Sequence, residues 1–305
     1  MTFPAITAGT RTVLQRTEWQ RRRDLHRARV DDLIGPYLKE RRRGRKHPVI
    51  DFLFTYYASR PAHVLRWHPG PGVVLEAGEE YLALRGYHRV AGGITVDPAY
   101  LRSRVGALGA TEALLRATAA RPARLGCFGL HEWAMLYRST DSRHDLPLRL
   151  GRSGTDRVVE DMPLRCTHFD AFRFFTPEAR PRNESQLTRD RQSHDEQPGC
   201  LHATMDLYRA CFSLAPLVES ELTIACFELA LRARELDMRA SPYDLRDLGY
   251  QSVPIETAAG RAQYVREQSA IAADGESLRS AVADRCAQLL EQVPRDAREQ
   301  LITGE

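Results

Sequence analysis

The sequence has no long hydrophobic run and almost no lysine. No stretch of its 305 residues approaches the roughly 18 consecutive apolar residues that a membrane-spanning helix needs. The first residues also lack the basic and then apolar pattern of a secretion signal. We therefore predict a cytoplasmic protein that makes no use of a membrane. Lys39 and Lys46 are the only lysines and the other cations are arginines, which we attribute to genome composition.

Closely spaced cysteine pairs are also absent. The six cysteines are spread along a chain without a secretion signal, so a disulfide framework is not expected. None of them belongs to the two-residue-spaced pair of a common structural zinc site. No glutamate is followed three residues later by histidine, which excludes the usual helical di-iron motif. We expect free thiols.

The hydrophobic and charged fractions, 43% and 28%, are those of an ordinary globular protein. Apolar residues recur at helical spacing along much of the chain. Short strands are expected within 73–95, and 97–119 is predicted to be a helix broken near Gly106 to Gly109. The pattern predicts a mainly α protein with a small β component (α+β) and a helical C-terminal half, whose expected helices span 199–214, 219–239, 257–273 and 276–293.

Basic residues are concentrated near the N-terminus. Residues 11–46 contain 13 Arg and Lys against 5 Asp and Glu, although the net charge of the chain is only +4. We predict a basic helical arm over 1–46, broken at Gly35-Pro36. The arm could bind DNA phosphates or could be a solvated helix face with local ion pairs. The candidate phosphate-binding residues are Arg21, Arg22, Arg23, Arg41, Arg42 and Arg43.

The rest of the chain, 47–305, is predicted to form a single α-rich domain. Residues 184–198 are polar enough to be an exposed loop or lid. A division of the domain into two lobes near this segment stays open, because either arrangement is compatible with the pattern.

The letters PLRCTHFDAFRFF place ionisable side chains among phenylalanines. As a strand, 166–174 would have a face too polar for plain core and too aromatic for plain surface. We therefore predict that it forms the wall of a pocket for a planar ligand. The side chains on that face would be Cys166, His168, Asp170, Phe172 and Phe174.

Two further segments carry candidate site residues. The letters HEWAMLYR, at 131–138, combine an imidazole and a carboxylate with aromatic rings. A helix starting at Cys200 aligns polar side chains on one stripe, because three- and four-residue steps share a helix face. Both sets could instead be core with locally satisfied polar groups. The residues concerned are His131, Glu132, Trp133, Tyr137, His202, Asp206 and Arg209.

A metal site is an alternative, because three cysteines each have a histidine close by in the sequence. Thiolate and imidazole are preferred ligands of zinc, and His168-x-Asp170 matches the first two ligands of a facial iron triad. Under this alternative the chain is a zinc or non-haem iron enzyme of small-molecule metabolism. Its candidate ligands are His131, His168, Asp170 and His202.

Five strings carry a family resemblance: HPVIDFLFTYYASRPAHVLRWHPG, CFGLHEWAMLYR, THFDAFRFFTPEARPRN, QPGCLHATMDLYR and RELDMRASPYDL. Together they resemble a family of bacterial proteins labelled 3-methyladenine DNA glycosylase, over roughly residues 47–265. The resemblance implies a base-excision enzyme that cleaves the N-glycosidic bond of an alkylated purine. DNA would be its partner, and it would need no cofactor.

Under this hypothesis Asp170 or Glu132 orients water and stabilises an oxocarbenium-like sugar, because an alkylated purine is already a good leaving group. His168 or His131 would tune that carboxylate. The extruded base would be held by stacking on Phe172, Phe174, Trp133 and Tyr137, with His202, Asp206 and Arg209 as further contacts.

A nucleic-acid-binding protein without chemistry is a further alternative.

Overall fold

The computed structural model describes residues 11–141 and 144–294. It is 58% helical and 6% strand, so the predicted class, mainly α with a small β component, is confirmed. The helical C-terminal half is present as well. Residues 1–10 of the predicted arm and 295–305 of the predicted domain lie outside the described residues.

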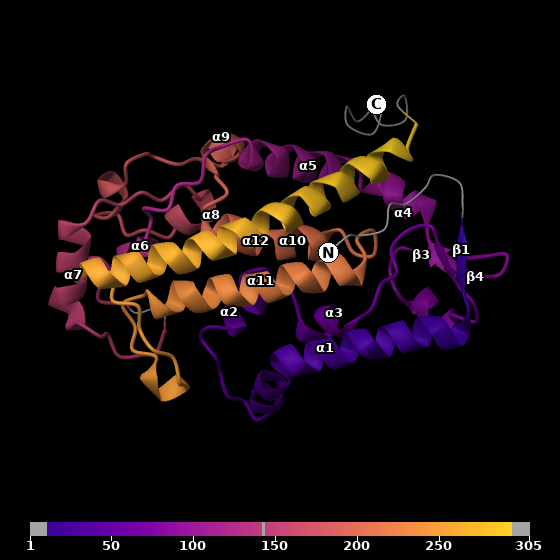
Figure 1. Ribbon diagram of the computed structural model, residues 1–305, viewed down its shortest axis with the longest axis horizontal. Helices are drawn as coiled ribbons and strands as arrows, with labels where there is room; N and C mark the ends of the chain where they lie inside the picture. Colours follow the sequence, from indigo (N-terminus) through magenta and orange to yellow (C-terminus); the bar gives the residue numbers. More distant parts are fainter. Residues whose placement is uncertain (1–10, 142–143, 295–305) are drawn as a thin grey trace.

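The α-helices differ widely in length. In the described residues six of them have six residues or fewer, and the longest, α12, comes last in the chain (Figure 1). They are α1 (Arg16–Arg42), α2 (Asp51–Thr55), α3 (Pro61–Leu65), α4 (Pro98–Ser103), α5 (Val105–Ala119), α6 (Leu130–Ala134), α7 (Gly151–Asp161), α8 (Phe169–Phe172), α9 (Gln192–Asp195), α10 (Leu201–Ser213), α11 (Ser220–Arg239) and α12 (Ala258–Glu291). Short 3₁₀ turns are η1 (Glu79–Ala83), η2 (Arg180–Arg182), η3 (Arg189–Arg191) and η4 (Arg246–Leu248).

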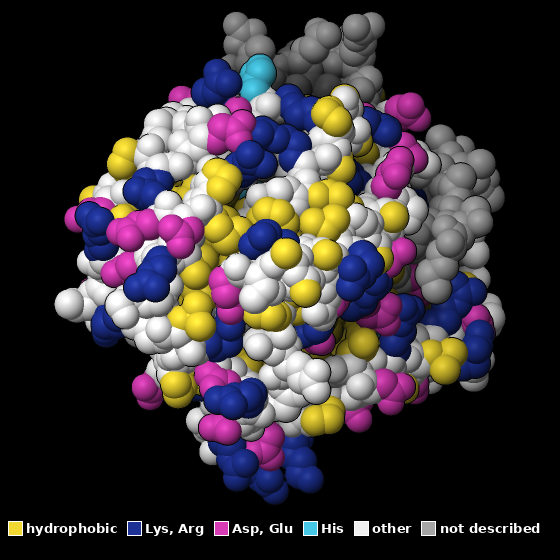
Figure 2. Space-filling view, turned by 60° about the vertical axis from the view of Figure 1, so that its left-hand side comes forward, with side chains coloured by type: hydrophobic (Ala, Val, Ile, Leu, Met, Phe, Trp, Pro, Cys, Tyr) yellow, Lys and Arg dark blue, Asp and Glu magenta, His cyan; other side chains and the backbone are white. Residues whose placement is uncertain are grey.

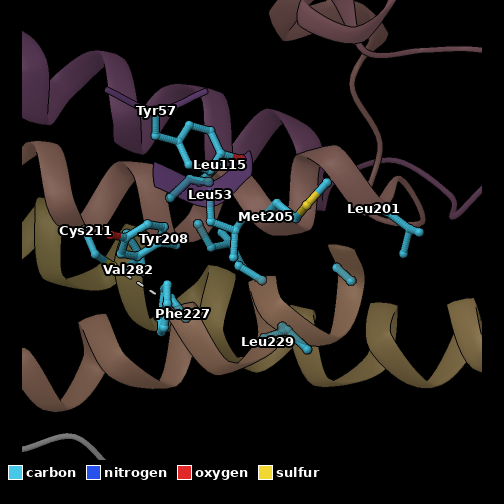
Figure 3. Close-up of a cluster of buried hydrophobic side chains, with 14 of the residues drawn as sticks. Leu53, Tyr57, Leu115, Leu201, Met205, Tyr208, Cys211, Phe227, Leu229 and Val282 are labelled. Carbon is cyan, nitrogen blue, oxygen red and sulfur yellow. Dashed lines mark hydrogen bonds between the residues drawn. The ribbon is translucent and has the colours of Figure 1, made fainter. Parts of the chain in front are cut away.

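Helices α5, α10, α11 and α12 form the body of the molecule (Figure 1). Helix α12 contacts the other three, and α10 packs along α11. Apolar side chains from α10 and α11 meet α12 in a buried cluster (Figure 3). Met205, Tyr208, Phe227 and Val282 are fully buried there. The apolar residues whose helical spacing predicted these helices therefore form the helix faces that are buried in the core.

A four-stranded sheet lies at one end of the molecule, near the start of α1 (Figure 1). Its order is β1-β2-β4-β3, with β1 parallel to β2 and the other pairs antiparallel. The strands within 73–95 were expected, whereas β1, near the N-terminus, was not. The strands are β1 (Thr12–Leu14), β2 (Val73–Leu75), β3 (Tyr87–Val90) and β4 (Gly93–Val96).

Helix α1 packs against the body instead of projecting from it. It contacts α3 and α11, and Trp19, Ile34 and Tyr37 are buried in the same cluster as the central helices. The predicted break at Gly35-Pro36 is wrong, because α1 continues to Arg42 with Pro36 inside it. Buried side chains on both sides of the proline hold the helix together although one backbone hydrogen bond is lost.

Two other boundaries also differ from the prediction. The expected helices 257–273 and 276–293 are one continuous helix, α12, in which Gly275 lies against Thr204 of α10. Within 97–119 the helix is interrupted at Arg104 and not near Gly106. In both places a glycine inside a helix is tolerated because packing contributes more than local propensity.

Residues 166–174 do not form the predicted strand. Cys166 and its neighbours are extended and are held by the side chain of Asn183, and the chain then turns into α8. Helical spacing separates the side chains that strand alternation would have aligned. Phe172 packs in the core against Phe175, whereas Asp170 and Phe174 line a cavity.

Candidate functional site

A small cavity of about 130 Å³ lies between α2, α6, α8, α10 and α11. Three aromatic rings line it, those of Phe52, Tyr56 and Phe174, and Phe52 and Tyr56 stack with ring centroids 4.7 Å apart. Four ionisable side chains of the lining come from four different helices, α6, α8, α10 and α11. The lining residues are Phe52, Tyr56, Glu132, Met135, His144, Asp170, Ala171, Phe174, His202 and Arg234.

Next to the cavity, His131, His202 and Asp237 come together from α6, α10 and α11. All three side chains are buried, and one ligand-type atom of each lies within 4.8 Å of the others. His131 Nε2 is 2.8 Å from Asp237 Oδ1. Within the described structure neither atom has a well-aligned hydrogen-bond partner, so their close approach is not a properly formed hydrogen bond. The two imidazole rings meet edge to face with centroids 4.5 Å apart.

The electrostatic environment of these three residues is uneven. Burial lowers the pKa of His202 well below its usual value, with the neighbouring His131 adding to the effect, so its imidazole is neutral. Burial also lowers the pKa of His131, but the charge of Asp237 outweighs this and raises it well above the usual value. Burial raises the pKa of Asp237, but the larger opposite effect of His131 and Arg234 brings it below its usual value, so the carboxylate is ionised.

Arg234 connects the three residues to the cavity. Its guanidinium donates to Asp237 Oδ2 and to Glu132 Oε1, both at 2.7 Å, and lies over the Phe52 ring at 4.0 Å. Burial disfavours the ionised form of Glu132, but Arg234 lowers its pKa. The arrangement fixes Asp237 so that its other oxygen, Oδ1, faces His131.

A second buried group, His168, Glu196 and Asp206, adjoins the first. His168 Nε2 is 3.3 Å from Glu196 Oε1 and 3.4 Å from Asp206 Oδ2, and its ring centroid is 5.2 Å from that of His202. Asp206 also accepts from Tyr57 at 2.8 Å. Although burial raises the pKa of Asp206, His168 and a nearby arginine lower it to about 2. His168 and Asp206 therefore form a compensated ion pair, whereas burial raises the pKa of Glu196.

Asp170, the carboxylate singled out from the sequence, lines the cavity but is surrounded by arginines. Arg189 forms a bidentate pair with it, Arg173 Nε is 3.2 Å away, and Arg209 NH1 is 3.6 Å away. Arg189 comes from the segment that was expected to be an exposed lid, and that segment also supplies Glu196. Guanidinium groups therefore occupy both carboxylate oxygens of Asp170, which leaves it poorly placed to orient a water molecule.

The structure divides the predicted aromatic residues into two groups. Phe174 lines the cavity. Trp133 is buried elsewhere and donates from Nε1 to the Ala240 carbonyl at 2.9 Å. Tyr137 donates to Glu160 at 3.1 Å. With Phe172 in the core, only one of the four aromatic residues predicted to hold a base is placed to do so.

Sequence reasoning found His131 and His202 but grouped them with different side chains from those they meet in the structure. The predicted metal set joined them to His168 and Asp170, whereas the structure joins them to Asp237. Arg234 was missed entirely. The available signal was the pair of charged residues three positions apart on the otherwise apolar face of α11.

Most of the predicted phosphate-binding arginines are engaged in local ion pairs. Arg42 is exposed at the end of α1. On the face in Figure 2, basic and acidic side chains are interspersed rather than separated. The pairs are Arg21 and Arg22 with Glu18, Arg23 with Asp24 and Glu80, Arg41 with Asp51, and Arg43 with Glu40.

Comparisons with protein families, with curated proteins and with solved structures give no match for this chain. Over residues 11–141 and 144–294, none of the helices combines the length and apolar character required to span a bilayer. The cysteines at all six positions are free thiols.

Proposed function

We propose that this protein is a metal-dependent enzyme of small-molecule metabolism, with zinc or iron(II) held by His131, His202 and Asp237. The observation that carries the proposal is the convergence of two imidazoles and a carboxylate beside the cavity. Two of their atoms, His131 Nε2 and Asp237 Oδ1, are buried, close together and without aligned hydrogen bonds in the described structure. A shared cation would satisfy both atoms.

The donor set suits a catalytic metal better than a structural one. Two histidines and a carboxylate leave coordination positions for water or substrate, whereas structural zinc sites are closed by four protein ligands. His202 is already neutral, which is the metal-binding form of imidazole, whereas a bound ion would have to displace the proton that Asp237 favours on His131. Arg234 holds the second oxygen of Asp237, as groups surrounding a metal ligand commonly do.

The cavity points to the substrate class. His202 belongs both to the metal triad and to the cavity wall, so a ligand in the cavity would lie next to the ion. A volume of about 130 Å³ admits only a small molecule, and the rings of Phe52, Tyr56 and Phe174 favour a planar one. Glu132 and Arg234 offer it polar contacts.

Elemental analysis of the purified full-length protein tests the metal. We expect stoichiometric zinc or iron in wild type, and its loss in Asp237→Asn and in His202→Ala. Asp206→Asn is the matched control, because Asp206 is also a buried carboxylate beside a histidine, that of the second group. It should keep the metal. Circular dichroism would show whether each variant is folded.

Two results would overturn the proposal. One is a wild-type protein that is purified without metal and takes up neither zinc nor iron(II) in equilibrium dialysis. The other is an Asp237→Asn variant that keeps the full metal content of wild type. A wild-type protein that binds metal should also lose thermal stability when a chelator removes the ion, because a ligand bound only to the folded state stabilises it.

A DNA N-glycosylase that removes an alkylated purine is the second candidate. It is favoured by the stacked rings of Phe52 and Tyr56 facing a cavity that also contains Glu132 and Asp170. The arginines around Asp170 and the ion pairs along α1 make it the weaker candidate. Release of free base from methylated DNA by wild type, and its loss in Asp170→Asn, would support it. No release would exclude it.

Both candidates are proposed to act in the cytoplasm. A reducing compartment keeps thiols free, in agreement with the six unpaired cysteines. DNA as a partner belongs to the second candidate alone.

A further inference from the structure

A second and larger cavity, of about 330 Å³, lies where α1, α3, α4, α10 and α11 meet. In Figure 1 this is the region around α3, between α1 and the central helices. Its described lining shares no residue with the small cavity beside the metal triad. Its volume lies within the usual range for pockets that hold an organic ligand, so it is large enough to bind a ligand separate from that of the small cavity.

One wall of this larger cavity is aromatic. The His63 ring of α3 stacks on Phe212 of α10, with centroids 5.2 Å apart and an interplanar angle of 19°. Tyr208 extends the same wall, with its ring centroid 6.1 Å from that of Phe212. Tyr100 of α4 also lines the cavity. Flat rings in this arrangement favour a planar ligand that can stack on them.

The cavity carries positive charge that no carboxylate of its described lining compensates. Arg66 and Arg85 both line it and both are exposed. In the described part of the chain neither guanidinium lies within ion-pair distance of a carboxylate, unlike most arginines of α1. The Arg85 guanidinium lies over the Tyr100 ring at 5.4 Å, which directs it along the aromatic lining.

Three histidines add uncharged donors and acceptors to this lining. Burial lowers the pKa of His26, His63 and His68, that of His68 to about 3, so all three are neutral near pH 7. His63 Nδ1 accepts from the Arg60 backbone N–H at 3.2 Å, which leaves Nε2 as the protonated nitrogen. The only net charges of the described lining are therefore the two guanidiniums.

We propose that this cavity binds a small organic anion, a planar aromatic body that carries a carboxylate or phosphate group. The ring would stack on the wall formed by His63 and Phe212, and the anionic group would pair with Arg66 and Arg85. Guanidinium groups bind both kinds of anion through paired N–H donors. The site does not depend on the metal triad, because none of its lining residues belongs to the triad.

Isothermal titration of the full-length protein tests this site. The probes are benzoate and phenyl phosphate. Inorganic phosphate, which has the anionic group without the ring, and benzyl alcohol, which has the ring without the charge, test the two halves of the ligand separately. We expect one of the aromatic anions to bind, and the two separate halves to bind at least about tenfold more weakly. Whether benzoate or phenyl phosphate binds more tightly identifies the anionic group.

Variants separate the contribution of the arginine charges to binding from that of the stacked ring. Arg66→Gln and Arg85→Gln should each weaken binding of the aromatic anion by about tenfold, because each removes one charge-assisted contact. Phe212→Leu should weaken it by removing the stacked ring. Arg102→Gln is the matched control, an exposed arginine of α4 outside the described lining, and should leave binding unchanged.

Three outcomes would overturn the proposal. They are the absence of binding to wild type at millimolar probe, binding of inorganic phosphate as tight as that of phenyl phosphate, and unchanged binding in the double variant Arg66→Gln and Arg85→Gln. Because both arginines are exposed, these variants should keep the wild-type fold, which circular dichroism would verify.

Discussion

Four charged or ionisable side chains form a buried chain of alternating sign beside the small cavity. Glu132 pairs with Arg234, Arg234 with Asp237, and Asp237 faces His131. Each is almost completely removed from water. Burying a single charge without a partner costs several kcal/mol, so the four residues must be considered as one unit. Arg234 is its central member, because it contacts both carboxylates.

Replacing Arg234 by methionine should strongly destabilise the fold. The substitution leaves Glu132 and Asp237 buried without their common cation, and we expect a loss of about 3–5 kcal/mol in the free energy of unfolding. Urea denaturation with EDTA present would measure it. The control is Arg232→Met on the same helix, where an exposed ion pair with Asp274 is lost at a cost below about 1 kcal/mol. Equal losses in the two variants would contradict the prediction.

Among the helices, α12 shows how one glycine can be replaceable and another required. The helix spans 34 residues and packs along α5, α10 and α11. A Cβ added at Gly275 would meet Thr204 at 3.4 Å, an ordinary contact. A Cβ added at Gly260 would lie 2.0 Å from the Pro254 carbonyl oxygen, which is backbone and has little room to move. At Gly275 the effect of a substitution is therefore set by helix propensity, whereas at Gly260 it is set by close packing against the backbone of Pro254.

The two glycine-to-alanine variants should therefore change stability in opposite directions. Gly275→Ala should raise the free energy of unfolding by up to about 1 kcal/mol, since alanine loses less backbone entropy in a helix. Gly260→Ala should lower it by about 1–3 kcal/mol through overpacking. Thermal or urea denaturation of both proteins gives the comparison. A stable Gly260→Ala variant would show that the loop around Pro254 can move aside.

At the level of the whole molecule, one hydrophobic cluster runs from the N-terminal segment to the end of α12. It contains Trp19 and Ile34 of α1 together with Leu289 near the C-terminal end of α12. An ion pair between Arg29 and Glu228 of α11 adds to the contact, with Arg29 NH2 2.5 Å from Glu228 Oε2. Since segments that share a core lose their packing together, α1 should unfold with the central helices.

Hydrogen exchange followed by mass spectrometry tests this cooperativity. Amides in the middle of α1 should exchange with an opening free energy comparable to those of α10 and α11. Glu228→Gln should weaken the contact without removing the buried apolar residues, so it should lower protection only slightly. Fast exchange throughout α1, with α10 and α11 still protected, would instead indicate a separate arm.

The sequence by itself determined the local features of this protein. Hydrophobic periodicity is a local property, so it was enough to predict the fold class and the positions of α10 and α11. Helix boundaries were predicted less well, because Pro36 and Gly275 weaken a helix locally while packing against distant segments maintains it. The sequence also supplied the types of side chain at the site: imidazoles, carboxylates and aromatic rings.

Only the tertiary structure decided how these side chains combine. His131 and Asp237 lie far apart in the chain and meet because α6 packs near the end of α11, whereas Asp170 is paired with arginines from other segments. The segment expected to be a lid supplies Glu196 and Arg189 to this network. The interaction of charges depends on distance in space, which residue spacing does not encode for separate helices, and so the partner of each ionisable group could not be predicted from the sequence.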